Sequence, residues 1–511
     1  MSSTDNNKRI AKNALFLYLR MFLMMGVTLF TSRVILQTLG VEDFGIYNVV
    51  AGIVVLFAFI NNAMAIASQR FLSFALGKKD EQEVKRVFSM SLTSHIAIAG
   101  IVLLFAETVG IWVLWKMNFP ENRMAAVGWA YHFAVLTCVA NIVRVPYNAA
   151  IIAYERMSFY AWISIVEVIL KLAIVYLLVV YHGDKLIFYS FLLFVVTLVI
   201  NVAYKFYSNR QFTTSKYHFF WDKSLFKQFI SFSGWSLTGS LANVGAQQGL
   251  NMIINVFCGV VVNAAVGVSN QVMGAVGLFL SNFQTAFNPQ LVKSYATGEK
   301  DYFMSLIFKS SKFSYYLMFI LSLPAIVNCE FLLSIWLGEV PTYSVEFSQL
   351  MIVFLLFDAI SGPLWISVQA TGKIKNYQLL MSLLILLNLP IAYALLKVGY
   401  SPVYVFIARV IINIVILSAR IIYLRPFIQL SIRKYTVQVL VPILFVTILS
   451  LPLPLWVYRN LEFGWTNLIT VTILSVLVSS FMIYTIGLSS GEKKWLKKMI
   501  REKNINKIRY E

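Results

Sequence analysis

The chain has 511 residues, of which 59% are hydrophobic and only 13% are charged, and its mean hydropathy is +0.75. Soluble domains carry about 25% charged residues. The composition therefore excludes a soluble globular protein and predicts one that lies in a lipid bilayer. The three cysteines, Cys138, Cys258 and Cys329, lie in apolar runs and indicate neither a disulfide framework nor a metal site.

Mostly apolar runs of roughly 20 or more residues, each long enough to cross a membrane as a helix, number about 14. Their approximate limits are 11–36, 44–66, 88–115, 125–153, 159–181, 186–207, 228–256, 262–286, 305–327, 346–370, 377–397, 402–424, 435–457 and 466–488. The first run is too long for the core of a cleavable signal peptide, so we expect it to remain as a helix. The predicted fold class is an all-α polytopic membrane protein.

The net charge of +20 is distributed unevenly between the two sides of these runs. With the N-terminus placed in the cytoplasm, the inner segments hold about 32 Lys and Arg and the outer loops about five, as the positive-inside rule requires. The C-terminus then also lies in the cytoplasm. Topology and attraction to anionic membrane lipid account for the positive charge, so nucleic acid is not expected as a partner.

Residues 45–80 recur about 222 positions later, which indicates an internal repeat. One set of matches pairs Gly45, Asn48, Val50, Gly52, Leu56 and Phe57 with Gly267, Asn270, Val272, Gly274, Leu278 and Phe279. After the loss of one residue, a second set pairs Gln69, Ser73, Ala75, Gly77, Lys79 and Asp80 with Gln290, Ser294, Ala296, Gly298, Lys300 and Asp301. Both copies start from the same side of the membrane, which predicts parallel repeats with the path for cargo between them.

The repeat predicts two pseudo-symmetric lobes of six helices each. They occupy 1–210 and 228–425, with a cytoplasmic interfacial linker at 211–227, two extra transmembrane helices within 426–490 and a basic cytoplasmic tail at 491–511. The FFWDKSLFKQF segment, which begins in the linker, fits either an interfacial amphipathic helix or a plain loop. The two extra helices have no counterpart in the repeat, so they either line the cargo path or pack against it.

A fainter match supports the same register. It places Asn141, Pro146 and Tyr160 about 217 positions before Asp358, Pro363 and Tyr377. Proline removes a backbone donor and kinks a helix. Pro146 and Pro363 therefore fit two interpretations, a kink that serves packing or a hinge for rocking of the lobes.

Charged residues within apolar runs are costly and are candidates for function. We assign substrate binding to Arg20, Arg33, Arg144 and Arg409, and ion coupling to Asp358, Glu167 and Lys171. Cations exceed acids, which predicts attraction of an anion such as a pyrophosphate or an acidic sugar, because guanidinium groups match phosphate and carboxylate oxygens. Asp358, close to the kink at Pro363, is the best candidate for a site that binds a coupling proton or cation.

Some of these charges also have a structural interpretation. Glu167 and Lys171 lie four residues apart on one helix and can neutralise each other. Arg409 can pair with Asp358 across helices, and Arg33 can reach the outer headgroups.

Arg20 and Arg144 are harder to explain in this way, because neither has an acid within a turn or two on its own helix. Contact with cargo and an ion pair with another helix are the two interpretations that remain for each.

Motifs for chemistry in water are missing. The sequence has no GxxxxGK[ST] phosphate loop and no HExxH, paired CxxC or GxSxG motif. No segment outside the apolar runs is long enough for a separate catalytic domain. The sequence therefore predicts a protein that is not an enzyme and has no cofactor.

The N-terminal 90 residues carry a specific pattern. It consists of Asn13, Arg20, Ser32-Arg33, the link LGVEDFGIY from Leu39 to Tyr47, and SQRFLS from Ser68 to Ser73. This pattern closely resembles the polysaccharide flippases of the multidrug/oligosaccharidyl-lipid/polysaccharide exporter superfamily. The resemblance implies a MATE-like plan of two lobes, and it matches the substrate assignment at Arg20 and Arg33.

The resemblance also implies a function. Such flippases move undecaprenyl-pyrophosphate-linked oligosaccharide repeat units across the bacterial inner membrane, for O-antigen of lipopolysaccharide, capsule or exopolysaccharide biosynthesis. Polymerase and chain-length proteins of that pathway are then expected partners.

The resulting hypothesis is a secondary flippase that works by alternating access, with coupling to protons or sodium through Asp358. The nearest alternative is a multidrug or organic-cation antiporter of the same superfamily, which predicts a cavity rich in unpaired acids. A membrane glycan polymerase or ligase predicts a long outer loop with clustered polar residues, and the sequence has none. A scaffold without transport activity is the third alternative.

Overall fold

The computed structural model describes residues 13, 16–24, 27, 31, 34, 35, 37–40, 42–47, 50, 58–115 and 119–493. These residues form helices and connecting segments, without a strand among them. The predicted site residue Arg33 lies outside the described residues, as do Asn48, Gly52, Leu56 and Phe57 of the first repeat copy.

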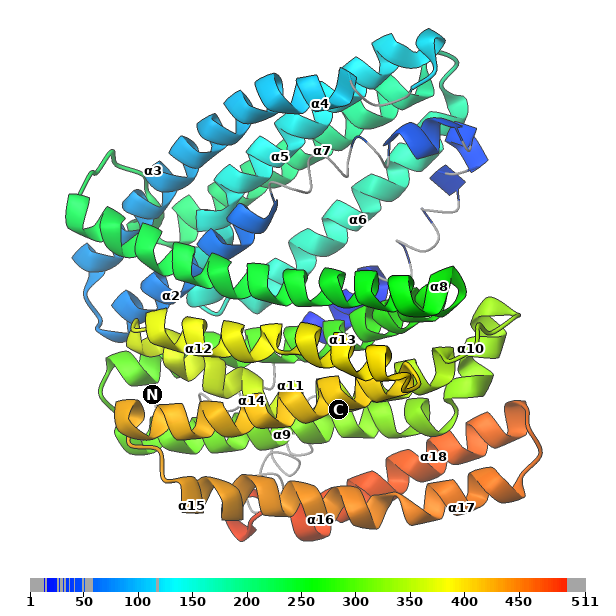
Figure 1. The fold of residues 1–511 in the computed structure, drawn as a ribbon. Coiled ribbons are helices and arrows are strands. Elements are labelled where there is room, and N and C mark those ends of the chain that lie inside the picture. Colours follow the sequence, from blue (N-terminus) through cyan, green and yellow to red (C-terminus); the bar gives the residue numbers. More distant parts are fainter. Residues whose placement is uncertain are drawn as a thin grey trace, which may run out of the picture. The chain divides into compact units, whose positions relative to one another are not determined.

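The α-helices follow one another with short connections (Figure 1). Their bounds are α2 (Ala58–Gly77), α3 (Glu81–Phe105), α4 (Ile111–Trp115), α5 (Met124–Ala153), α6 (Met157–Val180), α7 (Lys185–Gln211), α8 (Lys223–Ala296), α9 (Lys300–Val327), α10 (Cys329–Leu337), α11 (Ser344–Thr371), α12 (Lys375–Leu386), α13 (Asn388–Val398), α14 (Val403–Ile428), α15 (Ile432–Tyr435), α16 (Val441–Ser450), α17 (Pro452–Asn460) and α18 (Trp465–Met482). The described residues before Ala58 are also helical.

Among the described residues, 11 helical segments are long and apolar enough to cross a membrane. Each coincides with one of the apolar runs of the sequence, and the all-α membrane fold is confirmed. The runs expected at 11–36 and 44–66 are described only in part, and the run at 228–256 is helical within α8 but is not one of the 11. A total of about 14 therefore stays a prediction.

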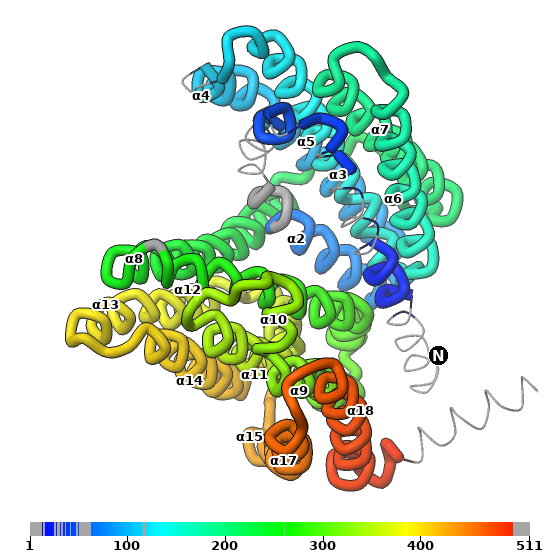
Figure 2. Tube along the Cα trace, turned by 90° about the vertical axis from the view of Figure 1, so that its right-hand side faces the viewer, coloured from blue at the N-terminus to red at the C-terminus, as the bar shows by residue number. Residues whose placement is uncertain are grey.

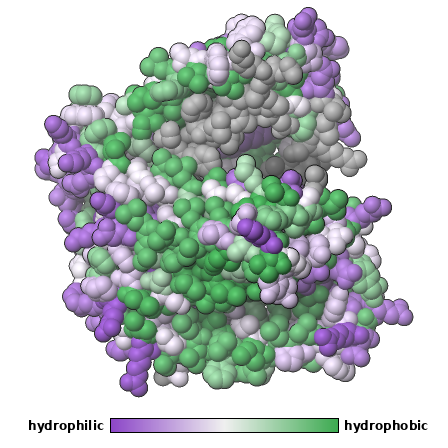
Figure 3. All heavy atoms as spheres, in the orientation of Figure 1, coloured by the Kyte–Doolittle hydropathy of each residue, from purple (hydrophilic) through white to green (hydrophobic). Residues whose placement is uncertain are grey.

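Apolar side chains lie exposed along the middle of these helices. Leu383 in α12, Ile411 in α14 and Leu477 in α18 are each more than half exposed. Figure 3 shows hydrophobic side chains over much of the visible face, with hydrophilic side chains gathered toward the helix ends. Such surfaces are unfavourable in water, and lipid tails are the solvent that suits them.

The helices form two compact units, which we describe separately. Unit 1 comprises Met1–Leu241, Thr285–Phe303 and Val368–Leu379, and unit 2 comprises Ala242–Gln284, Met304–Ser367 and Leu380–Glu511. In unit 1, α5 packs against α2, α3 and α7, and these helices run alongside one another (Figure 1, Figure 2). The lobe limits expected at residues 210 and 425 stay predictions.

Each unit contains one contact of the same kind between two long helices. In unit 1, Asn201 of α7 donates from Nδ2 to the carbonyl oxygen of Ala140 in α5, at 2.8 Å. In unit 2, Asn413 of α14 donates from Nδ2 to the carbonyl oxygen of Phe354 in α11, at 3.0 Å. The two asparagines lie about 212 residues apart, close to the register of the repeat. The comparison of the two repeat copies did not identify these asparagines, because the residues around them do not match and only the contact is shared.

Two further contacts join segments of the two repeats inside unit 1. Arg70 of α2 donates from Nε to the carbonyl oxygen of Gln369 at 3.0 Å and from Nη2 to that of Ala370 at 3.1 Å. Glu155, between α5 and α6, accepts hydrogen bonds from Gln290 Nε2 at 2.8 and 2.7 Å.

The Glu155 carboxylate is completely buried and also forms an ion pair with Lys293 Nζ at 2.6 Å. In each contact, a residue of the first repeat is held by the second. These are buried charge-assisted contacts, the kind whose loss is most costly.

The junction between the repeats combines the two alternatives that the sequence left open, a loop and a helix. Residues 216–222 are irregular, and α8 begins at Lys223, where Asp222 caps it by accepting hydrogen bonds from the amides of Ser224 and Leu225. The FFWDKSLFKQF segment is thus divided between a loop and the first turns of a long helix, because the capping aspartate lies in its middle. Phe219 and Trp221 are exposed there beside lysines, as aromatic residues at a membrane interface are.

The long helix α8 changes direction at Gly259. This residue has a φ of +78°, which is not helical and which a side chain with a Cβ rarely adopts. The sequence places the boundary between the runs at 228–256 and 262–286 at this point. The glycine therefore provides the turn between two consecutive spans.

The two extra helical segments at the C-terminus pack against α9 in unit 2. Tyr315 and Thr447 share a hydrogen bond of 2.7 Å between their hydroxyls, and Tyr316 donates to the carbonyl oxygen of Gly487 at 3.2 Å. A buried ion pair of 2.6 Å links Lys312 to Glu492. Of the two roles open from the sequence, these contacts demonstrate packing against a neighbouring helix.

In unit 1, one arginine binds two aspartates. Arg123 donates to both oxygens of Asp43, at 2.9 and 2.7 Å, and from Nη1 to Asp184 at 2.6 Å. Asp43 belongs to the LGVEDFGIY link, and Asp184 caps α7 by accepting from the amides of Leu186 and Ile187. The cluster joins the starts of α5 and α7 to the link.

This cluster predicts an acid-sensitive contribution to stability. Burial alone raises the pKa of the Asp184 carboxyl, but hydrogen bonds from Arg123 and from backbone amides outweigh it and hold the pKa below its usual range. The contribution is therefore present above the unfolded pKa, about 4, and is lost as the pH falls through the folded pKa. We expect the thermal unfolding midpoint of the purified protein to fall as the pH drops below about 4.

Arg123→Ala is expected to lower the free energy of unfolding at neutral pH by roughly 1 to 3 kcal/mol and to flatten this acid dependence. Arg459→Ala, at an exposed arginine near the end of α17, is the matched control and should change neither. An Arg123→Ala protein with unaltered stability and unaltered acid dependence would contradict the role of the cluster.

Candidate functional site

Four of the predicted site residues lie together in unit 1, and we call them the cationic cluster: Arg20, Arg144, Glu167 and Lys171. Glu167 of α6 is at the centre. Its Oε1 lies 2.7 Å from Lys171 Nζ on the same helix, and its Oε2 lies 3.6 Å from Arg144 Nη1 on α5. Arg20, from the helical residues 16–24, interacts electrostatically with the same carboxylate.

Two tyrosines complete the surroundings of the arginines. Arg20 Cζ lies 4.3 Å from the centre of the Tyr160 ring, and Arg144 Cζ lies 5.4 Å from the centre of the Tyr204 ring. An aromatic face attracts a cation and orients a guanidinium, without neutralising its charge. The tyrosines therefore hold the arginines in place and leave their charge available.

The cluster keeps an excess of positive charge. Three cations and one carboxylate give a net charge of +2. Arg20 Nε is buried and has no hydrogen-bond partner among the described residues. A buried donor without a partner is costly, and an anionic ligand is one way to satisfy it.

The geometry contains two ion pairs that the sequence allowed. The Glu167–Lys171 pair exists, and Arg144 has an interhelical partner, which is the same Glu167. One carboxylate thus serves more than one cation. The assignments of Arg20 and Arg144 to substrate binding, and of Glu167 and Lys171 to ion coupling, stay predictions.

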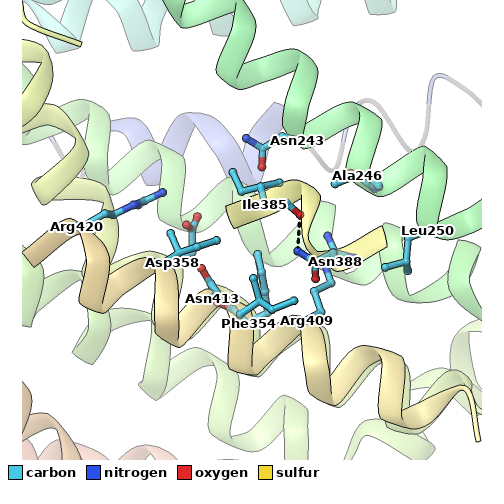
Figure 4. A pocket seen from close by; sticks show the side chains of 13 residues that line it. Asn243, Ala246, Leu250, Phe354, Asp358, Ile385, Asn388, Arg409, Asn413 and Arg420 are labelled. Atoms are coloured by element: carbon cyan, nitrogen blue, oxygen red, sulfur yellow. Dashed lines mark hydrogen bonds between the residues drawn. The ribbon is translucent and has the colours of Figure 1, made fainter. Parts of the chain in front are cut away.

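Unit 2 contains a pocket with a polar lining, which we call the unit 2 pocket. It lies between α8, α11, α14 and the junction of α12 and α13 (Figure 4), and the space free of protein atoms there, part of which is open to the outside, is about 520 Å³. Its polar lining residues are Asn243, Gln247, Asp358, Asn388, Arg409, Asn413 and Arg420. Two of the predicted site residues, Asp358 and Arg409, are among them.

The charges in the pocket are arranged asymmetrically. Asp358 on α11 interacts electrostatically with Arg420 of α14, whereas Arg409 Cζ lies 5.1 Å from the centre of the Phe354 ring. Neither arginine forms an ion pair with Asp358 among the described residues. Side chains on a helix lean toward its N-terminus. This tilts Arg420 toward the level of Asp358 and Arg409 away from it, in agreement with Figure 4.

Arg420 was missed as a site residue because it lies near the inner end of its apolar run and was counted with the inner charges. A signal was present: Arg409 and Arg420 are 11 residues apart, which is close to three helical turns and places both on one face. Asn388 was missed for another reason. Pro390 lacks an N–H, and the helix between residues 375 and 398 is interrupted at Leu387. This interruption carries Asn388 into the pocket lining.

The two predicted hinge prolines both lie inside continuous helices. Pro146 is within α5 and Pro363 is within α11. The carbonyl oxygen of Pro363 accepts a hydrogen bond of 2.7 Å from Ser367 Oγ. A role as hinges stays a prediction.

A search of protein-family models finds no match to the chain, and a search of curated proteins finds none either. Solved structures, however, match most of its length. One is described as the outward-facing conformation of a multidrug resistance MATE family transporter of the MOP superfamily. It has a TM-score of 0.70 and 13% identity, and the match covers 83% of this chain and 96% of that one. The chain has the MATE fold.

Two further solved structures match the fold of this chain. A MATE protein in complex with MaD3S gives a TM-score of 0.70 at 13% identity, covering 83% of this chain and 96% of that one. A MOP superfamily transporter from Pyrococcus furiosus gives 0.67 at 13% identity over 82% and 96% of the two chains, and its description reports reverse polarity of the binding pocket. Identities this low demonstrate the fold alone. Together with the 11 apolar helical segments, the fold identifies a multi-pass membrane protein.

Arg420 interacts electrostatically with Asp358 in the unit 2 pocket. Arg420→Ala is expected to lower the free energy of unfolding by roughly 1 to 3 kcal/mol, because it leaves the Asp358 carboxylate without this cation in an apolar bundle. The double variant Asp358→Asn with Arg420→Ala should recover part of the loss. Thermal unfolding in detergent measures both.

Arg425→Ala is the matched control, since Arg425 is exposed on the same helix and does not line the pocket. If the single variant Arg420→Ala and the double variant are equally unstable, the two side chains are not coupled.

Proposed function

We propose that the protein is a flippase for undecaprenyl-pyrophosphate-linked oligosaccharide repeat units. It acts in the bacterial inner membrane with both termini in the cytoplasm, for O-antigen, capsule or exopolysaccharide biosynthesis. The single observation that carries the proposal is the cationic cluster of unit 1 with its net charge of +2. The resemblance of the N-terminal 90 residues and the MATE fold support it.

The charge of the cluster fits the head of such a cargo. A pyrophosphate diester carries two negative charges, which would neutralise the cluster. Guanidinium forks bind phosphate oxygens in pairs, and the buried Nε of Arg20 supplies a donor without a partner among the described residues. Recognition of the pyrophosphate depends on the linkage to the lipid and not on the sugars.

The coupling step is assigned to unit 2. Asp358 is the acid of the unit 2 pocket, and its protonation would change the charge of that pocket by one unit. Sodium, the other coupling ion that the sequence left open, would have to bind there beside two arginines. Alternating access then requires the repeats to move against each other. The contacts of Arg70 with Gln369 and of Glu155 with Gln290 join the repeats inside unit 1, and we infer that they separate during the cycle.

A multidrug or organic-cation antiporter is the second candidate. The observation in its favour is that one of the solved structures with this fold is described as a multidrug resistance transporter. The cationic cluster argues against it, because organic cations would be repelled by a net charge of +2. The two candidates therefore predict cargo of opposite charge.

The test is transport of a fluorescent lipid-linked oligosaccharide into proteoliposomes that contain the purified protein. Arg20→Ala combined with Arg144→Ala is expected to slow the initial rate by roughly tenfold or more, since a loss of about 1.4 kcal/mol in binding is a factor of ten. The matching Lys variants should retain part of the rate, because lysine keeps the charge but not the fork.

Arg210→Ala, at an exposed arginine at the end of α7, is the control and should transport at the rate of the unmodified protein. Unchanged flipping by the double Ala variant would eliminate the cationic cluster as the cargo site. Uptake of organic cations with no flipping of the lipid-linked glycan would support the antiporter instead.

A further inference from the structure

The unit 2 pocket contains a second cation that the proposed function leaves without a partner. Arg409 forms no ion pair with any residue that the structure describes, and its guanidinium lies over the Phe354 ring, 5.1 Å from the ring centre. Asp358 interacts electrostatically with Arg420 and forms no ion pair with Arg409 among the described residues. With Asp358 ionised, two arginines and one aspartate give the pocket a net charge of +1.

The neutral part of the lining is rich in acceptors. Gln247, Asn388 and Asn413 each commit the amide nitrogen to the protein, at 3.2 Å to Asn270 Oδ1, 2.7 Å to the Ile385 carbonyl and 3.0 Å to the Phe354 carbonyl. The amide oxygens of these three residues remain as acceptors for donors on a ligand. Hydroxyl groups are such donors, whereas ionised phosphate oxygens are acceptors and would be repelled.

Apolar side chains form the remaining wall. Ala246, Leu250 and Ile412 line the pocket beside the amides. A sugar ring has a face of C–H groups and a rim of hydroxyls, so a wall that is apolar on one part and acceptor-rich on another matches it.

The charge selects the kind of sugar. One carboxylate neutralises the net charge of +1, and its two oxygens match the fork of Arg409. A pyrophosphate would overcompensate it. A metal cation is disfavoured by the two arginines, although Asp358 and the amide oxygens would otherwise suit one.

We propose that the unit 2 pocket binds a carboxylate-bearing sugar residue of the cargo, with Arg409 holding the carboxylate and the amide oxygens of Gln247, Asn388 and Asn413 accepting from the hydroxyls. This proposal rests on the proposed function and adds the substrate class to it. The cargo is then an acidic glycan, one that carries a uronic acid.

Binding of small probes to the purified full-length protein tests this without transport. Methyl glucuronide and methyl glucoside differ only in the carboxylate, and calorimetric titration compares their affinities. We expect the glucuronide to bind at least roughly tenfold more tightly, and Arg409→Ala to remove the difference. Arg409→Lys keeps the charge should the Ala variant fail to fold, and it should reduce the difference. Arg425→Ala, exposed on the same helix, should leave it unchanged.

Three results overturn the proposal. Equal affinity for the two glycosides would show that the pocket does not recognise the carboxylate. Binding of acetate as tight as that of the glucuronide would show that it does not recognise the sugar. If the glucuronide does not bind, the pocket is not a sugar site. Transport distinguishes these from failure of the proposed function. If neutral and acidic lipid-linked glycans are flipped at equal rates and Arg409→Ala changes neither rate, the protein is a flippase but the unit 2 pocket does not bind its cargo. If the glucuronide binds but no lipid-linked glycan is flipped, the pocket binds an acidic sugar and the proposed function is wrong.

Discussion

An ionised group in the middle of an apolar helix bundle must be compensated, and the distribution of compensation determines what this protein can bind. Where each charge has a partner, the structure is held together: Glu155 with Lys293, and Lys312 with Glu492, are buried pairs of 2.6 Å. Where cations outnumber acids, a site remains that an anion can complete. The cationic cluster is of the second kind, since Glu167 alone faces three cations.

The internal repeat provides the frame in which the two sites differ. Asn201 in unit 1 and Asn413 in unit 2 make the same kind of contact with a neighbouring long helix, so the packing of the repeats is alike. The charges are not alike. Unit 1 has arginines beside tyrosines and a shared glutamate, whereas unit 2 has an aspartate between two arginines among amide side chains. The predicted duplication agrees with this shared packing contact, while the charged side chains differ between the units.

Much of the fold was predictable, because apolar runs and the bias of Lys and Arg depend on local sequence and on the membrane. The site was predictable only in part. Glu167 and Lys171 could be paired from their spacing on one helix, but the contact of Glu167 with Arg144 depends on how α5 packs against α6. Which arginine acts electrostatically on Asp358 could not be chosen from sequence, because it depends on the tilt of Arg409 and Arg420 along α14. The structure of the FFWDKSLFKQF segment could not be decided from the sequence. Its composition suits one short helix, but Asp222 caps α8 within it and so divides it into a loop and a helix start.

The central claim is that the cationic cluster recognises a pyrophosphate. Direct binding of a short-chain prenyl pyrophosphate to the purified protein, measured against the corresponding prenyl alcohol and against an organic cation, tests it without any assumption about the glycan. The account predicts binding of the pyrophosphate that is at least roughly tenfold tighter than that of the alcohol and that weakens as salt is added. Equal affinity for the pyrophosphate and the alcohol, or tight binding of the organic cation in competition with the pyrophosphate, would contradict it.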